Sequence, residues 1–392
     1  MGLSSLEQLF WIALFIIGYT FVGFGLVAFI IGKFKTQNRP AVPADLELLP
    51  NISVVVAAFN EKHYIQDKIE NTFGQSFPSH KIEMIVVADG SDDGTELVAE
   101  ADPRVRSMYD PPRRGKTAAL NRAIPTAQHD IILITDANAM LSKDAVLMMV
   151  RHFLNDKVGG VSGEKSIVVR SEDDAASSGE GAYWKYESFL KKCDDQLHTL
   201  IGAPGEIFAF RKKWFSPIPE DTILDDFMLS MKIVLANQRL AYEPEAIAVE
   251  EASSDVQQEM KRKIRICSGG WQSMLRLPKA FFFTPNLWVS FIFISHRVLR
   301  WSLTPFLLFV VFGLNLLLMH LNGVYLTFMI AQVTFYFLVF IGYLFRNKKI
   351  AIKGLFVPYY FWIMNFSAIL GLFRFLKGNQ SAAWERSKRK LN

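Results

Sequence analysis

The sequence has 392 residues, a formal net charge of +5 and two cysteines. The cysteines, Cys193 and Cys267, are too few for a disulfide framework or a cysteine-based zinc site, and they fit a reducing compartment. The basic residues cluster beside apolar segments, which suits an anionic membrane surface and argues against a nucleic acid as the partner.

The first predicted element is a membrane span within residues 1–50. Residues 10–31 carry no charged side chain, and such a run is long enough to cross a bilayer as a helix. Basic Lys33, Lys35 and Arg39 follow this run and none precedes it, which is unlike a secretory signal peptide. The positive-inside rule then predicts an N-terminus outside the cell and a following domain in the cytosol.

A globular domain is predicted over residues 51–278. Short apolar runs indicate buried strands, and amphipathic segments between them indicate helices. The predicted strands are residues 52–59, 83–89, 105–109, 130–136 and 158–163. The predicted helices are residues 61–75, 94–100, 116–127 and 142–153. This alternation predicts an α/β fold with a mostly parallel sheet and helices on both faces, which binds ligands at the carboxyl ends of its strands.

The last region, residues 279–392, is again apolar and aromatic. Residues 276–301 mix aromatic with basic side chains, which predicts an interfacial segment. Three later segments are apolar enough to cross the membrane, namely residues 302–320, 324–345 and 356–373. Three crossings would leave the C-terminus outside, whereas the basic residues 384–390 favour the cytosol. We therefore expect one of these segments to be re-entrant or interfacial, in a multi-pass protein of the plasma (inner) membrane.

Two acids and an amide follow buried strands. Asp89 ends the second predicted strand, and Asp136 and Asn138 follow the fourth. The carboxyl ends of parallel strands share one edge, so Asp89 and Asp136 are expected to lie close together. A divalent cation with a diphosphate would offset their repulsion, and Mg²⁺ or Mn²⁺ would bind Asp136 and the oxygen of Asn138. The alternative is that these residues only form turns.

Two helix starts carry further candidates. Gly115 and Lys116 open a predicted helix, where backbone N–H groups and the lysine would both favour a phosphate, although a solvated helix start explains them equally well. Asp225 and Asp226 head an amphipathic helix. They either cap that helix or provide a general base that takes the proton of an attacking hydroxyl.

A basic segment precedes a glycine pair and a tryptophan. Arg262 and Arg265 are three residues apart, so they share a helix face and could bind a departing diphosphate. The alternative is that these side chains reach the membrane surface. Trp271 would either stack on a sugar ring or anchor at the membrane interface.

Six motifs occur in a fixed order along the chain. They are "VVAAFNE", "VVADGSDDGT", "GKTAALN", "ITDANA", "DDF" and "KRKIRICSGGWQ". This ordered set resembles the family-2 glycosyltransferases of the Rossmann-like GT-A fold. The apolar flanks resemble the processive members that make poly-N-acetylglucosamine, hyaluronan, chitin and cellulose. The resemblance covers residues 51–272 by motif and the flanks by layout.

The resemblance implies roles for individual residues. On the donor side it implies Ala57, Phe59, Glu61, Asp89, Lys116, Asp136, Arg262 and Arg265. At the metal it implies Asp136 with Asn138, which stand at the family's Asp-x-Asp motif. For catalysis it implies Asp226 as the base, with Asp225 before it. On the acceptor side the candidates are Trp184, Glu187, Gly205 and Trp271.

Two departures from the family pattern affect these roles. Asn138 replaces the second acid of the metal motif, which removes one negative charge but keeps an oxygen. Arg262 and Ile266 stand where the family has Gln and Trp in its Gln-x-x-Arg-Trp motif. That Trp helps to hold the acceptor in processive members, so polymerisation would need Trp271 as a substitute.

Together the residues and the resemblance predict an inverting, metal-dependent glycosyltransferase. It would move a sugar from a UDP-sugar to a polysaccharide acceptor at the cytosolic membrane face. The first alternative is transfer of a single sugar to a lipid-linked acceptor, and the second is a non-catalytic membrane subunit of a polysaccharide synthase. The expected partners are the UDP-sugar, the glycan or lipid-linked acceptor, the lipid bilayer, and export or synthase subunits.

Overall fold

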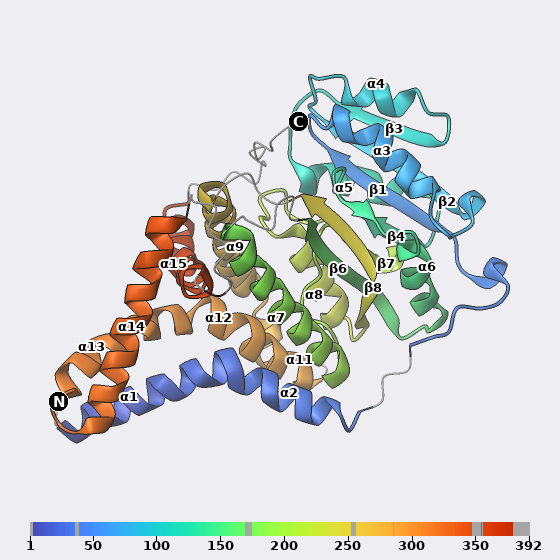
Figure 1. Ribbon diagram of the computed structural model, residues 1–392. Helices are drawn as coiled ribbons and strands as arrows, with labels where there is room; N and C mark the ends of the chain where they lie inside the picture. The colour runs from blue at the N-terminus through green and yellow to red at the C-terminus, as the bar shows by residue number, and fades with distance from the viewer. Residues whose placement is uncertain are drawn as a thin grey trace.

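An eight-stranded sheet forms the centre of the globular part (Figure 1). The structure is a computed structural model, and it describes residues 3–35, 39–168, 175–251, 256–284, 286–346, 354 and 356–378. The order of the strands across the sheet is β3-β2-β1-β4-β7-β6-β8-β5. The strands are β1 (Ile52–Ala58), β2 (Ile82–Asp89), β3 (Val105–Asp110), β4 (Ile131–Ile134), β5 (Met140–Leu141), β6 (Val158–Val168), β7 (Phe208–Arg211) and β8 (Arg239–Glu251).

The first half of the sheet is parallel, as predicted. β1 pairs in parallel with β2 and β4, and β2 pairs in parallel with β3. Strands buried on both faces need apolar side chains throughout, which explains their continuous apolar runs. Within β1, Val54 and Val56 enter one core cluster and Val55 enters the other. Beyond β4 the sheet is mixed, because β7 is antiparallel to β4 and β6, and β5 is antiparallel to β8.

Helices cover both faces of the sheet, which confirms the predicted α/β fold. The helices on the Val54 face are α3 (Lys62–Phe73), α4 (Thr95–Glu100) and α6 (Ala145–Val150). The helices on the Val55 face are α5 (Lys116–Ala123), α7 (Ala175–Leu197) and α8 (Asp225–Leu235). In α3 the apolar side chains of Ile65 and Ile69 are four residues apart, so they lie on one helix face and are both buried.

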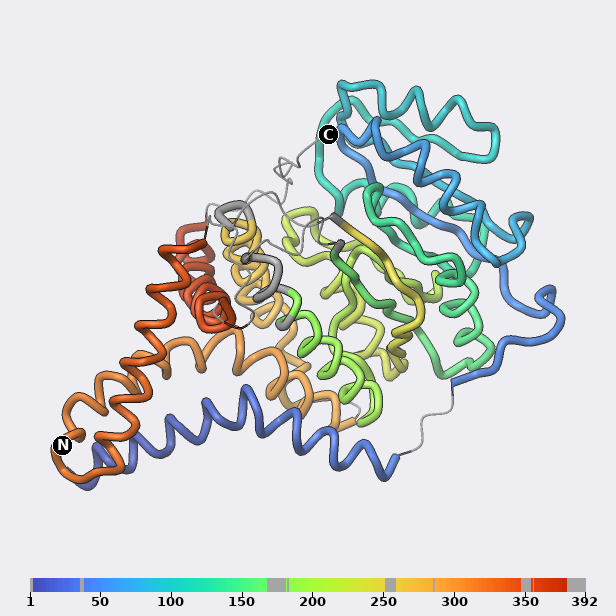
Figure 2. The backbone as a smooth tube through the Cα atoms, viewed as in Figure 1, coloured from blue at the N-terminus to red at the C-terminus, as the bar shows by residue number. Residues whose placement is uncertain are grey.

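Apolar helices lie beside the sheet domain and fit a membrane protein. By length and composition, the candidate spans are Leu3–Gly32, α14 (Gly323–Phe345) and α15 (Phe356–Leu376). The first comprises α1 (Leu3–Gly18), a π-helical turn (Tyr19–Gly23) and α2 (Phe24–Gly32). α1 runs beside α13 (Leu303–Leu318) in Figure 2, and Phe10 and Leu314 belong to one buried cluster. α15 packs against α9 (Val256–Arg276) of the sheet domain.

The segments predicted as interfacial and as the second crossing form one broken helix. It comprises α11 (Leu287–Ile292), a π-helix (Phe293–Val298), α12 (Leu299–Trp301) and α13. α13 has only 16 residues, and it passes as a span only together with the preceding part, from which it bends by 55°. The described residues thus hold three candidate spans, or four if the broken helix crosses. The basic residues 384–390 lie outside the described residues.

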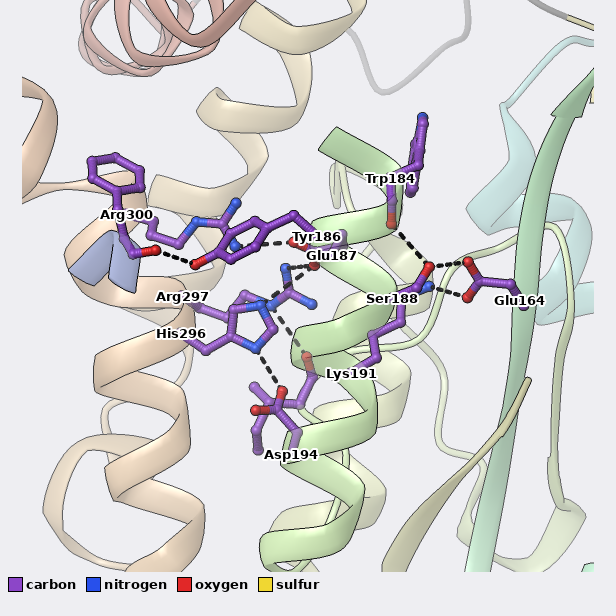
Figure 3. Close-up of polar contacts among 12 residues, drawn as sticks. Glu164, Trp184, Tyr186, Glu187, Ser188, Lys191, Asp194, His296, Arg297 and Arg300 are labelled. Carbon is purple, nitrogen blue, oxygen red and sulfur yellow. Dashed lines mark hydrogen bonds and ion pairs between the residues drawn. The ribbon is translucent and has the colours of Figure 1, made fainter. Parts of the chain in front are cut away.

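Helix α7 is joined to the broken helix by buried charges (Figure 3). Glu187 accepts hydrogen bonds from Arg297 at 2.6 Å and from Arg300 at 2.9 Å. Burial alone would raise the pKa of Glu187, but the two arginines outweigh it and hold that pKa well below its usual range. Two turns further along α7, Asp194 pairs with Nδ1 of His296 at 2.5 Å. These contacts fix α7 against the broken helix just before its bend.

Replacing Glu187 should weaken the attachment of α7 to the broken helix. Glu187→Ala removes the buried counter-charge of two partly buried arginines, and breaking a buried ion pair typically costs about 3–5 kcal/mol. We expect a clearly lower thermal midpoint of the full-length protein in detergent. Glu100→Ala, at the exposed end of α4, is the control and should leave the midpoint unchanged. A Glu187→Ala midpoint equal to that of wild type would show that these ion pairs do not stabilise the protein.

Candidate active site

The turn that follows β4, residues 135–139, is anchored to α3 by a buried lysine. Lys68 is fully buried, and its ammonium donates to Thr135 Oγ1 at 2.9 Å and to the carbonyl oxygen of Ala139. Burial lowers the pKa of Lys68 to about 7, although nearby Asp136 favours its charged form. Both ends of the turn that presents Asp136 are therefore held at the carboxyl edge of the sheet.

Asp89 and Asp136 are bound by neighbouring residues of one loop. Lys116, the first residue of α5, places Nζ 2.6 Å from Asp136 Oδ1. Gly115 donates its backbone N–H to Asp89 Oδ2 at 2.6 Å, and Arg122 donates to the other oxygen at 2.9 Å. Gly115 has φ +97°, a conformation that favours glycine. Adjacent residues at the start of α5 thus contact the two predicted acids, and a lysine, an arginine and a backbone N–H complement their charge.

Asp226 approaches the same lysine from α8. A Cβ atom added at Gly205 would lie 2.9 Å from Lys116 Nζ and 3.1 Å from Asp226 Oδ2, so the missing side chain lets both groups occupy this position. Burial and neighbouring Asp225 raise the pKa of Asp226 to about 7, while Lys116 opposes this shift. A carboxylate with such a pKa is suited to take a proton at neutral pH.

The predicted uridine pocket lies at the end of β1. Ala57 is partly buried near this end of the strand. Phe59 lies under the guanidinium of Arg113, whose Cζ is 3.6 Å from the ring centroid. The backbone N–H of Glu61 donates to Thr95 Oγ1 at 3.0 Å, which ties the loop after β1 to the start of α4. These residues stay candidates for binding the uracil ring of the donor.

A buried ion network that the sequence analysis missed lies beside the Asp136 turn. The ammonium of Lys165 on β6 contacts both Glu206 and Glu250, the latter on β8. Burial alone would raise the pKa of Glu206, but Lys165 lowers it to about 2. Glu250 also accepts the amide N–H of Asn138 at 2.8 Å. Charged residues inside apolar strands were the available signal, because Lys and Glu are seldom fully buried unless paired.

Helix α9 carries the predicted diphosphate arginines. Arg262 pairs with Glu259 of the same helix at 3.2 Å. Burial lowers the pKa of Arg265, and the negative charges of Asp225 and Asp226 counter that shift. Arg265 therefore lies near the predicted base, and its role towards a diphosphate stays a prediction.

The predicted acceptor residues have different neighbours in the structure. Gly205 adjoins the predicted base. Both oxygens of Glu187 accept hydrogen bonds from Arg297 and Arg300, and its role towards an acceptor stays a prediction. Trp184 lies with its ring centroid 5.3 Å from Lys263 Nζ, and Trp271 packs against the core of the domain. The roles of the two tryptophans towards an acceptor stay predictions.

The turn after β4 offers oxygen donors that fit Mg²⁺ or Mn²⁺. Asp136 provides a carboxylate, and Asn138 Oδ1 accepts no hydrogen bond from the described part of the chain. Among the described residues, no group of three or more His, Cys, Asp or Glu side chains is arranged to hold a metal. An ion there would complete its shell with phosphate oxygens and water, as Mg²⁺ commonly does.

Acidic side chains and a lysine meet at the carboxyl edge of the sheet. Asp136, in the turn after β4, faces Lys116, and the charges of Asp225 and Asp226 act on that lysine from α8. Residues 53–218 match the family model described as "Glycosyl transferase family 2". Residues 53–218 are therefore similar to family 2 glycosyltransferases, which confirms the resemblance seen in the motifs.

Curated relatives make a polysaccharide. Over 258 residues the chain is 28% identical to the poly-beta-1,6-N-acetyl-D-glucosamine synthase of Staphylococcus aureus (strain COL), covering 62% of this chain and 60% of the relative. The Staphylococcus epidermidis synthase (strain ATCC 35984) is 27% identical over 267 residues, covering 64% and 62% of the two chains. The match thus spans about three fifths of the length of these relatives.

A solved structure shares the fold over nearly the whole chain. It is a mannosyltransferase from Pyrobaculum calidifontis in complex with GDP-mannose and Mn²⁺. The TM-score is 0.71 and the sequence identity 21%, and the match covers 95% of this chain and 100% of that one. At this identity the likeness shows the fold alone.

A side chain at Gly205 should disturb the meeting of Lys116 with Asp226. Gly205→Ala places a methyl group 2.9 Å from Lys116 Nζ, the mobile end of a long side chain, so the lysine can move without unfolding the domain. We expect transfer activity to fall at least tenfold, with a nearly unchanged thermal midpoint. Gly181→Ala, which has open space around its added Cβ, is the control. Full activity of Gly205→Ala would contradict this arrangement.

Proposed function

We propose that the protein is an inverting glycosyltransferase that moves a sugar from a UDP-sugar to a polysaccharide acceptor at the cytosolic face of a membrane. The observation that carries this proposal is Asp226, whose pKa of about 7 suits a base and which adjoins Lys116 at the carboxyl edge of the sheet. An acceptor hydroxyl attacks the anomeric carbon and gives its proton to Asp226. The bond from that carbon to the diphosphate oxygen breaks, and UDP leaves.

Positive charges around Asp226 support the departure of the diphosphate. The charges of Lys116 and Arg265 act on Asp226, and Arg262 lies near Arg265 and Glu206, so all three would offset negative charge on the leaving group. Asp136 and Asn138 would hold Mg²⁺ or Mn²⁺. The bound ion would neutralise charge on the diphosphate.

The relatives indicate which product to test first. The staphylococcal relatives are poly-N-acetylglucosamine synthases, so N-acetylglucosamine is the first sugar to try, and mannose from the structural neighbour's GDP-mannose is the second. The apolar helices beside the sheet domain suit an acceptor that stays at a membrane. The same helices favour the alternative, transfer of a single sugar to a lipid-linked acceptor. Export or synthase subunits would be partners of the first activity.

The central test is transfer by the full-length protein in lipid nanodiscs. Labelled UDP-N-acetylglucosamine and Mn²⁺ are supplied, and both UDP release and product length are measured. A ladder or long polymer supports the proposal, and a single addition supports the lipid-linked alternative. Asp226→Asn should lower transfer by at least about a hundredfold, with unchanged UDP affinity. Wild-type UDP release no faster than that of Asp226→Asn, across a panel of nucleotide sugars, would refute the enzymatic proposal.

The pH dependence of transfer follows from the Asp226 carboxyl. It must be ionised to take a proton, and its pKa is raised to about 7, so kcat/KM should rise as the pH rises through about 7. Asp225→Asn removes a like charge that raises this pKa, so the acid limb should move to lower pH. Asp221→Asn, which removes a largely exposed carboxylate on the preceding loop, should leave the limb in place. Identical acid limbs in the pH profiles of kcat/KM for wild type and Asp225→Asn would argue against Asp226 as the titrating base.

A further inference from the structure

The side chain of Asn138 poses an orientation problem that an aspartate would not have. Its amide has one oxygen and one nitrogen of nearly the same shape, so packing alone does not decide which end faces a cation. Only the oxygen can bind a metal. A rotation of 180° about the Cβ–Cγ bond of Asn138 exchanges the positions of the oxygen and the NH₂ group. Asn138 is buried with 6% of its surface exposed, so water has little access to correct this choice.

The hydrogen bond to Glu250 fixes the orientation of the Asn138 amide. Its Oε1 accepts a hydrogen bond from Asn138 Nδ2 at 2.8 Å. An ionised carboxylate can only accept hydrogen bonds, so the nitrogen must turn towards Glu250 and the oxygen away from it. This leaves Asn138 Oδ1 without a hydrogen bond from any described residue, so its lone pairs are available to a metal.

The sheet explains why Glu250 reaches this position. β5 follows the turn directly and pairs antiparallel with β8, with Met140 opposite Val249. The next residue of β8 is therefore brought beside the turn. Lys165 of β6 engages the second oxygen, Oε2, so both carboxylate oxygens have fixed partners. The lysine also offsets the negative charge that a buried glutamate would otherwise add beside Asp136.

We propose that Glu250 is a positioning residue that holds Asn138 with its oxygen towards the divalent ion at Asp136. This inference rests on the proposed function, since it assumes that the turn after β4 binds that ion. It also accounts for the asparagine in place of an acid: the amide supplies an oxygen, and a carboxylate from another strand sets its direction.

The test is the affinity of the full-length protein for Mn²⁺ in the presence of UDP, measured from the paramagnetic resonance signal of free Mn²⁺. In Glu250→Gln the new amide can donate as well as accept, so Asn138 is no longer fixed. We expect affinity to fall by about tenfold to a hundredfold, the usual effect of losing a group that orients a metal ligand. Glu245→Gln, an exposed change on the same strand, is the matched control and should keep the wild-type affinity.

A second substitution separates orientation from charge. Asn138→Asp in the Glu250→Gln background gives a ligand with two oxygens, which needs no orientation, so Mn²⁺ affinity should return at least to the wild-type value. Unchanged affinity in Glu250→Gln, or a loss that Asn138→Asp does not restore while the thermal midpoint is native, overturns the inference alone. Wild-type protein that binds no Mn²⁺ with UDP overturns both the inference and the metal site of the proposed function.

Discussion

Burying carboxylates at one edge of a sheet is the constraint that shapes this molecule, because an unpaired buried charge costs several kcal/mol. Most acids here meet a cation from a different element. The pairs are Asp89 with Arg122, Asp136 with Lys116, and Glu206 and Glu250 with Lys165. Asp226 differs, since its neighbour Asp225 is also an acid and its pKa is raised to about 7. One carboxyl therefore keeps a high proton affinity, as a general base needs.

The parallel half of the sheet could be predicted because its physical signal is local. β1 and β2 are apolar over most of their length, and helices with an apolar face separate the parallel strands. β7 and β8 escaped prediction for two reasons. β7 has only four residues, and β8 contains glutamates whose charges are paired across the fold. In a linear sequence such glutamates look like residues of a solvated surface.

One part of the candidate site could be predicted, because the carboxyl ends of parallel strands share one edge of a sheet. The part that depends on ion pairs between residues far apart in the sequence could not. That rule placed Asp89 and Asp136 at a common edge. By contrast, Lys165 and Glu250 are 85 positions apart, and Glu187 and Arg297 are 110 apart. The first pair depends on the register between β6 and β8, and the second on where the apolar helix breaks. Neither ion pair can be predicted from local periodicity. The acceptor role of Glu187 was therefore predicted from the motif alone.

The predicted base is connected to the apolar helices through one aromatic side chain. Phe227, the residue after Asp226, packs edge-on against Trp301 with ring centroids 5.2 Å apart. Trp301 also faces Gly270 of α9, where an added Cβ would lie 2.8 Å from the indole ring. It ends α12, next to the 55° bend of the broken helix. Trp301 therefore contacts both α8, which carries Asp226, and α9, which carries Arg265. The turn after β4 is instead tied to α3 through Lys68. The broken helix thus packs on the helices that present Asp226 and Arg265, while the Asp136 turn is held from the opposite face of the sheet.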